Sequence, residues 1–260
     1  IEIIDEPTTK KTGSAFTGTA PRVRLFDSFD NPVTISSGIT VRATLVSSQS
    51  AALPTVTQSS AVTFNSEGIA SLAGFDFVAA PGSYRLEFNA SNFAPVTSAP
   101  FTVTVADPSI LTWQTPPPSS LVTGITMPTA VLKIEDVYGN LVTGDNSTVV
   151  TITSSNSATL SGITAVAQGG LVTFTNFNMI AIPGNYAIKF TATNPNASSI
   201  NNISVSSAVA ITNDVAAKLQ VEVSGLQTPE AGLPLKYSAG GYLRVRVLDR
   251  FDNLVTSGSD

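Results

Sequence analysis

The amino-acid sequence predicts an all-β fold made of repeated two-sheet units, and three observations carry this prediction. Short apolar runs alternate with polar residues at a period of two, as they do along half-buried strands. Glycine and proline, 18 and 16 of the 260 residues, interrupt the chain throughout, and no stretch has the 3.6-residue period of an amphipathic helix. Two motifs recur along the chain at roughly the spacing of one β-sandwich domain, so the pattern is internally repeated.

The first recurring motif is an acidic turn of the form D-x-(F/Y)-(D/G)-N-x-V-T. It begins at Asp27, Asp136 and Asp249, so successive copies lie 109 and 113 residues apart. Asp and Asn side chains bond to their own backbone and tolerate positive φ, and glycine adopts positive φ freely. The motif therefore predicts a tight turn after a strand, in which Gly139 of the second copy keeps the geometry that an aspartate provides in the other two.

The second recurring motif contains a glycine, a phenylalanine and then P-G-x-Y. It spans residues 68–88 and returns at residues 170–190, each position shifted by 102. Because the acidic turns of these copies are 109 residues apart, the first copy is expected to carry an insertion, placed by composition near residues 47–60. We expect Tyr84 and Tyr186 to open a strand and to tie their hydroxyls to nearby backbone, as in a tyrosine corner.

The two motifs together define the domain boundaries. We expect one unit over residues 1–107, a second over 108–215 and the first part of a third over 216–260. The connections between them are short and polar, which favours semi-rigid joints. The third copy stops after its acidic turn, so we expect that the polypeptide continues or that another chain supplies the missing strands by β-strand addition.

The second copy gives the clearest strand map. We predict strands near residues 110–114, 130–136, 149–154, 158–161, 171–176, 186–193 and 203–211. Seven strands are typical of the constant-type immunoglobulin domain, so each unit is predicted to be an immunoglobulin-like β-sandwich. In the other copies the alternation places five residues on the inward face: Val23 and Leu25, and Leu243, Val245 and Val247.

Composition excludes several classes of function. The chain has no cysteine and no histidine, which rules out disulfides, the common zinc sites and Ser-His-Asp or Cys-His triads. Charged residues make up 12% of the chain, the net charge is −5, and Lys10-Lys11 is the longest basic run. Nucleic acid and anionic membrane surfaces are therefore not expected as partners. No apolar run is long enough to span a membrane, and the scattered carboxylates suggest no enzymatic activity.

The motifs resemble the bacterial immunoglobulin-like repeats of large surface proteins, which include invasin- and intimin-type adhesins and S-layer proteins. The acidic turn is also similar to the D-x-x-G-N turn of filamin-type repeats. The resemblance covers the whole second copy and the first copy from about Gly13. It implies an extracellular or cell-surface structural protein that forms a stalk, filament or S-layer-type assembly with neighbouring repeats or copies of itself. It equally fits an adhesin for host receptors or glycans, or a phage tail or capsid decoration.

The acidic residues also suggest calcium, whose ligands are hard oxygen atoms. The candidate ligands are Asp27, Asp30, Asn31, Asp249, Asp252 and Asn253 in two of the turns, and Asp107 and Asp214 at the connections. Gly139 removes one such ligand from the second turn, which favours a turn function over a required metal. No other cofactor is expected. Four N-x-S/T sequons are candidate glycosylation sites: Asn89, Asn146, Asn196 and Asn202.

Aromatic residues distinguish the structural alternative from the adhesin alternative. A solvent-facing cluster formed by Phe16, Phe93, Trp113 or Tyr237 would favour a binding surface, and their burial would favour a spacer. Trp113 precedes three consecutive prolines. We expect its ring to lie in a core or at a connection between units.

Overall fold

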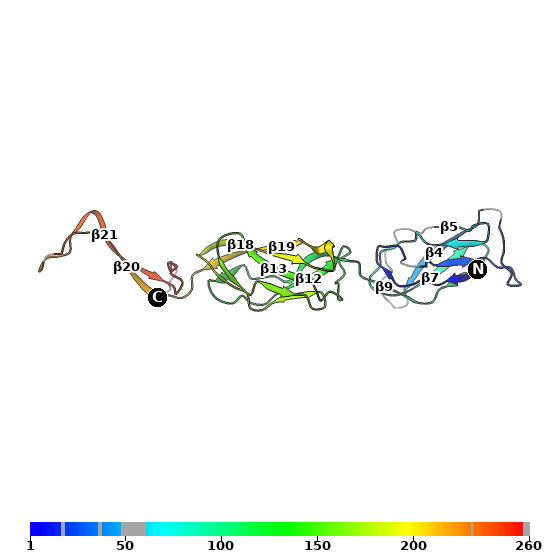
Figure 1. Ribbon diagram of the computed structural model, residues 1–260, viewed down its shortest axis with the longest axis horizontal. Helices are drawn as coiled ribbons and strands as arrows, with labels where there is room; N and C mark the ends of the chain where they lie inside the picture. The colour runs from blue at the N-terminus through cyan, green and yellow to red at the C-terminus, as the bar shows by residue number, and fades with distance from the viewer. Residues whose placement is uncertain (17–18, 36–37, 48–60, 230, 257–260) are drawn as a thin grey trace. The chain divides into compact units, whose positions relative to one another are not determined.

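The structure is a computed structural model that describes all residues except 17–18, 36–37, 48–60, 230 and 257–260. Nearly all of the insertion expected near residues 47–60 lies outside the described residues. The described part is all-β, with one short 3₁₀ turn at Ser198–Ile200 (Figure 1). None of its helical segments is long and apolar enough to cross a membrane.

The chain divides into two compact units. The first comprises Ile1–Ile110 and Glu135–Val142, and the second comprises Leu111–Ile134 and Thr143–Asp260. The acidic turn of the second motif copy therefore packs as part of the first unit. The second unit likewise includes the acidic turn of the third copy.

The first motif copy contains two sheets. The smaller has the order β1-β3-β6, from Glu2–Asp5, Arg22–Arg24 and Ile69–Ser71. The larger has the order β2-β9-β7-β4-β5, with β8 also paired to β7 (Figure 1). Its strands are β2 (Lys10–Lys11), β9 (Phe101–Thr104), β7 (Gly82–Ala90), β4 (Thr40–Ser47), β5 (Ala61–Thr63) and β8 (Val96–Thr97). Strand β2 runs parallel to β9, whereas β4, β5 and β7 pair antiparallel.

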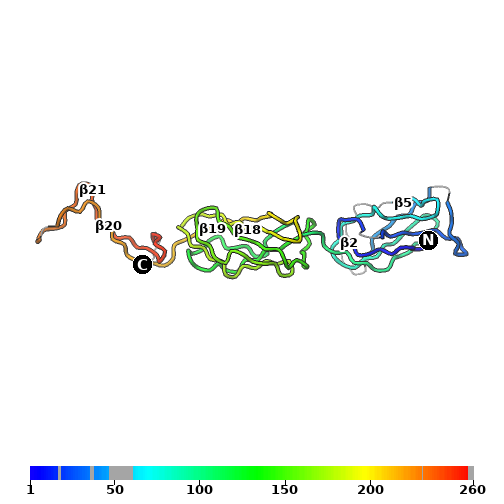
Figure 2. Tube along the Cα trace, in the orientation of Figure 1, coloured from blue at the N-terminus to red at the C-terminus, as the bar shows by residue number. Residues whose placement is uncertain are grey.

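The second motif copy repeats this plan. One sheet has the order β10-β12-β16, and the other β11-β19-β18-β13-β15, in which β18 and β19 run side by side (Figure 2). The strands of the first sheet are β10 (Pro108–Thr115), β12 (Ala130–Asp136) and β16 (Leu171–Phe174). Those of the second are β11 (Ser120–Val122), β19 (Ser204–Thr212), β18 (Gly184–Thr193), β13 (Val149–Ser154) and β15 (Thr164–Val166). A separate ladder pairs β14 (Thr159–Ser161) with β17 (Asn178–Ile180).

The strand predictions for the second copy are confirmed. Strands β12 and β13 have the predicted bounds, and the other five predicted strands lie within two residues of theirs at each end. Strands β11, β15 and β17 were not predicted. Each has only three residues, which is too short for an alternating pattern to stand out from its surroundings.

Burial follows the predicted alternation in the first copy. Val23 and Leu25 have no exposed surface, and the core around them is rich in phenylalanine. Burying side chains of this size stabilises a fold by about 1.5–3 kcal/mol each. The tyrosine corners are also confirmed, because the hydroxyl of Tyr84 donates to the carbonyl of Ala80, and that of Tyr186 donates to Ile182, each at 2.8 Å.

The third copy forms a two-stranded hairpin of β20 (Lys218–Leu226) and β21 (Tyr237–Leu248). The prediction that Leu243, Val245 and Val247 are buried is wrong, because these side chains are 55%, 56% and 39% exposed. They do share one face, since they pair across the hairpin with Val223, Val221 and Leu219. No second sheet covers that face within the described part of the chain, so correct alternation does not lead to burial.

Candidate functional site: the acidic turns and the glycines beneath their rings

The acidic turn of the first copy is closed by its leading aspartate. Oδ1 of Asp27 accepts hydrogen bonds from the backbone N–H of Phe29 at 2.8 Å and from that of Asn31 at 2.9 Å. The backbone N–H of Asp27 donates to the carbonyl of Asn31 at 2.9 Å. Asp30 takes a φ of 60°, the left-handed conformation that Asp tolerates better than most residues.

The other two turns have the same internal bonds. Asp136 accepts from the N–H groups two and four positions later, both at 2.9 Å, and Asp249 does so at 2.8 and 2.9 Å. The left-handed position is Gly139, with φ 81°, in the second copy and Asp252, with φ 68°, in the third. The prediction that glycine keeps the turn geometry in the second copy is therefore confirmed.

Two of the three aspartates also hold a segment that precedes their own motif copy. In the first unit, the N–H of Ala106 donates to Oδ2 of Asp136 at 2.9 Å. In the second unit, the N–H of Asp214 donates to Oδ2 of Asp249 at 3.0 Å. Both accepting residues are fully buried. The same carboxylate thus closes its own turn with one oxygen and fixes the incoming linker with the other.

These hydrogen bonds set the pKa of the carboxylates. Burial alone raises the pKa of Asp136, but bonds from the side chain and backbone of Asn140, and from the N–H groups of Ala106 and Tyr138, outweigh it and lower the pKa below its ordinary value. The pKa of Asp249 is lowered by the same balance. Both side chains therefore carry a negative charge near neutral pH, and their bonds to N–H groups are of the stronger, charge-assisted kind.

The aromatic residue of each of these turns lies on a glycine. A Cβ atom on Gly13 would come within 1.7 Å of the Tyr138 hydroxyl oxygen, and one on Gly124 within 2.1 Å of Cζ of Phe251. Both glycines have positive φ, of 65° and 71°. Any side chain there would displace the ring as well as strain the backbone.

The residues around each glycine also correspond. The N–H of Gly13 donates to Phe77 and that of Gly124 donates to Met179, at 3.0 and 2.9 Å. The preceding residues, Thr12 and Thr123, are fully buried. Their hydroxyl oxygens accept the backbone N–H groups of Ala79 and Ala181, at 2.9 and 3.1 Å. We call each buried threonine with the glycine that follows it, together with the carbonyl that this glycine binds, a Thr-Gly seat.

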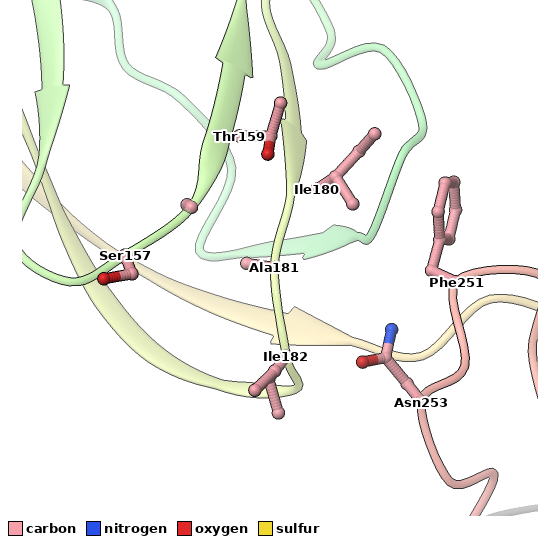
Figure 3. Close-up of a pocket in the computed structure, with 8 residues that line it drawn as sticks. Ser157, Thr159, Ile180, Ala181, Ile182, Phe251 and Asn253 are labelled. Carbon is pink, nitrogen blue, oxygen red and sulfur yellow. The ribbon is translucent and has the colours of Figure 1, made fainter.

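A shallow pocket lies beside the seat of the second unit (Figure 3). Phe251 and Asn253, from the turn after β21, line it together with Ile180 and Ile182 from β17 and the residues that follow it. In the close-up the ring of Phe251 stands beside Ile180, and Asn253 lies near Ile182. The lining contains no titratable side chain, so it offers packing area and amide groups but no acid–base chemistry.

Three of the candidate calcium ligands form ion pairs. Asp107 pairs with Lys11 at 2.6 Å, Asp252 pairs with Lys218 at 2.7 Å, and Oδ2 of Asp214 lies 2.8 Å from Nε of Arg250. Within the described residues, no group of three or more acidic, histidine or cysteine side chains is placed to hold a metal ion. Calcium binding at these positions stays a prediction, while the turn contacts are observed.

The four sequon asparagines, Asn89, Asn146, Asn196 and Asn202, are all exposed. Two of them already make side-chain bonds. Nδ2 of Asn89 donates to Glu87 at 2.8 Å, and Oδ1 of Asn146 accepts the N–H of Gly169 at the same distance. Glycosylation of these residues stays a prediction.

The aromatic residues named from the sequence do not form a solvent-facing cluster. Phe16 is buried in the core of the first copy, and Phe93 and Tyr237 are partly buried. Trp113 is also partly buried, and its ring packs edge-on against Phe190 with centroids 4.9 Å apart. The ring thus contacts the core of the second copy, which is one of the two places expected for it.

Sequence reasoning missed two features. One is the Thr-Gly seat, although a Thr-Gly pair recurs at residues 12 and 123, which is a detectable signal. The other is Lys10, which was considered only as part of the longest basic run. Its side chain is fully buried, with Nζ 2.8 Å from Oδ1 of Asp76 and 4.4 Å from the ring centroid of Phe77. Only its alternation with exposed Lys11 on a two-residue strand could have indicated an inward position.

Comparison with known proteins finds likeness at the level of structure. No family model matches the chain, and no curated protein matches it in sequence. Among solved structures, FdeC, an Escherichia coli adhesin, aligns with a TM-score of 0.48 and 16% identity over 98% of this chain and 74% of its own. InvD of Yersinia pseudotuberculosis aligns with a TM-score of 0.37 and 18% identity over 95% of this chain and 69% of that protein. The S-layer protein SbsC aligns with a TM-score of 0.31 and 17% identity over 91% of this chain, which spans 27% of the SbsC chain. All three TM-scores lie below 0.5, so the all-β fold of this chain rests on its own strands and sheets.

Proposed function

We propose that this chain is part of a structural protein of the cell surface or extracellular space, and that its immunoglobulin-like modules serve as spacers in a stalk, filament or S-layer-type assembly. The module boundaries that go with this proposal are residues 1–107, 108–215 and 216–260. Its partners are neighbouring modules or further copies of the protein.

The observation that carries the proposal is the double contact made by the acidic turns. In each compact unit a buried carboxylate fixes the linker N–H, and an aromatic ring occupies a Thr-Gly seat. Linkers between independently moving domains are typically exposed and make few contacts. A linker held by a charge-assisted bond and a fitted ring suits a protein whose task is to keep successive modules in a fixed relation.

The packing of two aromatic candidates, and the absence of a solvent-facing cluster of the four, support the same proposal over the adhesin alternative. Exposed, clustered aromatic side chains are what a receptor or glycan surface commonly presents. Phe16 instead packs against Phe101 in the core of the first copy, and Trp113 of β10 packs against Phe190 of β18, a strand of the other sheet of the second copy. The structural role is therefore the one we propose.

Electron microscopy of native cells tests this function. Antibodies raised against the full chain should label intact cells, and deletion of the gene should remove a visible filament, stalk or surface layer. Labelling that requires lysis of the cells would contradict the surface location. A deletion strain with an unchanged surface but lost attachment to host cells or glycans would replace the structural role with the adhesin role.

A further inference from the structure

The acidic turn of the first copy has the form of the other two but lacks their partners. Phe29, the counterpart of Tyr138 and Phe251, is 82% exposed. Oδ2 of Asp27 accepts only the side-chain amide of Asn31, at 3.2 Å, among the described contacts. In the other two turns the corresponding oxygen also binds the N–H of a linker.

This turn is already in the binding conformation. The backbone N–H groups two and four positions after Asp27 donate to it at 2.8 and 2.9 Å. The corresponding distances are both 2.9 Å at Asp136, and 2.8 and 2.9 Å at Asp249. The φ of Asp30, 60°, lies close to that of Asp252, 68°. The geometry therefore does not depend on a bound linker, and docking would require no rearrangement of the turn backbone.

The engaged turns define what a partner must offer. It must present a glycine at positive φ, because a Cβ atom on Gly13 or Gly124 would overlap the docked ring. It must also present an unpaired backbone N–H at the end of a module. In both examples that N–H belongs to the linker that enters the first strand of the same motif copy, with Ala106 two residues before β10 and Asp214 four residues before β20.

From these observations we propose that the turn from Asp27 to Asn31 is a docking surface for the end of another immunoglobulin-like module, joined through a linker to Ile1. The ring of Phe29 would occupy a Thr-Gly seat on that module, and Oδ2 of Asp27 would accept the N–H of the linker. The inference concerns module joining alone and does not rest on the surface role proposed above.

A fusion protein tests this docking. Residues 1–111 are placed directly ahead of Ile1 of the full chain, so that the added module supplies the seat formed by Thr12 and Gly13. Ala106 of the added module then lies 32 residues before Asp27, between the 30 and 35 residues that separate the bonded pairs in the existing linkers. The added module carries a complete core of its own, since every buried core residue of the first copy lies between Phe16 and Val103.

The measurement is hydrogen exchange of the peptide that spans the fusion point, whose sequence is unique in the protein. We expect the amide of Ala106 in the added module to be protected to the same degree as Ala106 of the original chain. Asp27→Ser with Phe29→Ser in the original part should speed its exchange at least tenfold. Asp30→Gly, which copies Gly139 of an engaged turn, should leave the protection unchanged and serves as the matched control.

A second variant approaches the contact from the other side. Gly13→Val in the added module alone blocks the seat, and it should release the same amide without any change in the Asp27 turn. Equal exchange of the linker amide in the fusion and in both variants would overturn the proposal. Core amides of β3 and β7 are followed in every sample, so a loss of protection at the linker alone is distinguished from unfolding. The native-cell experiment is independent of this result.

Discussion

Lys10 provides the sharpest test of the packing described above, because the second copy contains its apolar counterpart. Lys10 pairs with Val103 in the parallel ladder of β2 and β9, and Leu121 pairs with Ile211 in the ladder of β11 and β19. Leu121 is 7% exposed, so the site accepts an uncharged side chain of similar length. The change Lys10→Leu thus gives the first copy the residue that the second copy has at the corresponding position.

The expected magnitude follows from the surroundings of the ammonium group. Nζ of Lys10 has no exposed surface and is compensated by Asp76 and by the ring of Phe77, whereas the Asp76 side chain is 44% exposed and keeps its solvation when the partner is removed. Replacing a buried ion pair by a well-packed apolar side chain is neutral or stabilising by about 1–4 kcal/mol. We therefore expect Lys10→Leu to raise the free energy of unfolding of the first unit by an amount in this range.

Two further variants separate charge from packing. Asp76→Ala leaves the buried ammonium without its counter-ion, and loss of one partner of a buried pair costs about 3–5 kcal/mol. Leu121→Lys makes the reverse exchange in the second copy, where Asn178 stands at the motif position of Asp76, and should strongly destabilise the second unit. Differential scanning calorimetry of the full chain would follow both units. A lower unfolding temperature of the first unit in Lys10→Leu would refute the reasoning and show that the ion pair is a net stabiliser.

Three other predictions concern the turns and one buried network. Asp136→Asn should weaken the hydrogen bond from the Ala106 N–H. Because hydrogen bonds to charged groups contribute about 1.5–3 kcal/mol, amide hydrogen exchange at Ala106, measured by mass spectrometry, should be roughly 10- to 100-fold faster. An unchanged exchange rate would contradict the conclusion that Asp136 holds the linker. The native pKa values of Asp136 and Asp249 lie below the value of about 3.9 in an unfolded chain, so their stabilisation is complete above that pH and is lost as the pH falls through the lower native values. The melting temperature should accordingly fall less steeply with decreasing pH, between neutral and strongly acidic pH, in the double variant Asp136→Asn, Asp249→Asn. An equal pH dependence of the melting temperature in both proteins would contradict the lowered pKa values of the two aspartates. Asp145→Ala leaves the buried Thr148 N–H and hydroxyl without the carboxylate that accepts from both, and should destabilise the second unit by about 2–4 kcal/mol in calorimetry. The matched change Glu67→Ala at an exposed position should leave the stability unchanged.

Strands and turns that are determined by neighbouring residues could be predicted from the sequence. The strand at residues 130–136 was predicted with its observed bounds because apolar and polar residues alternate over its length, and the turn at Asp136 because its residue types select one backbone geometry. Both signals depend only on neighbours in the chain. These patterns can therefore be recognised in the sequence without knowledge of the tertiary contacts.

The contacts of the turns could not be predicted in the same way. The bond from Ala106 to Asp136 joins residues 30 positions apart, and the ring of Tyr138 meets Gly13 across 125 positions. Neither of these sequence separations corresponds to the period of a helix or a strand. The burial of Lys10 could not be predicted for a related reason. Its partners, Asp76 and Phe77, lie next to it only in the folded chain.

The pairing of ring and glycine has a consequence for how such a chain can change in length. Each of the first two copies carries both halves of a joint, a Thr-Gly seat at its start and an acidic turn with an aromatic ring further along. The two occupied seats accept different rings, tyrosine on Gly13 and phenylalanine on Gly124. A genetic event that duplicates or deletes one whole copy would therefore bring together a Thr-Gly seat and an aromatic ring again, and we expect such an array to lengthen or shorten while keeping this kind of joint.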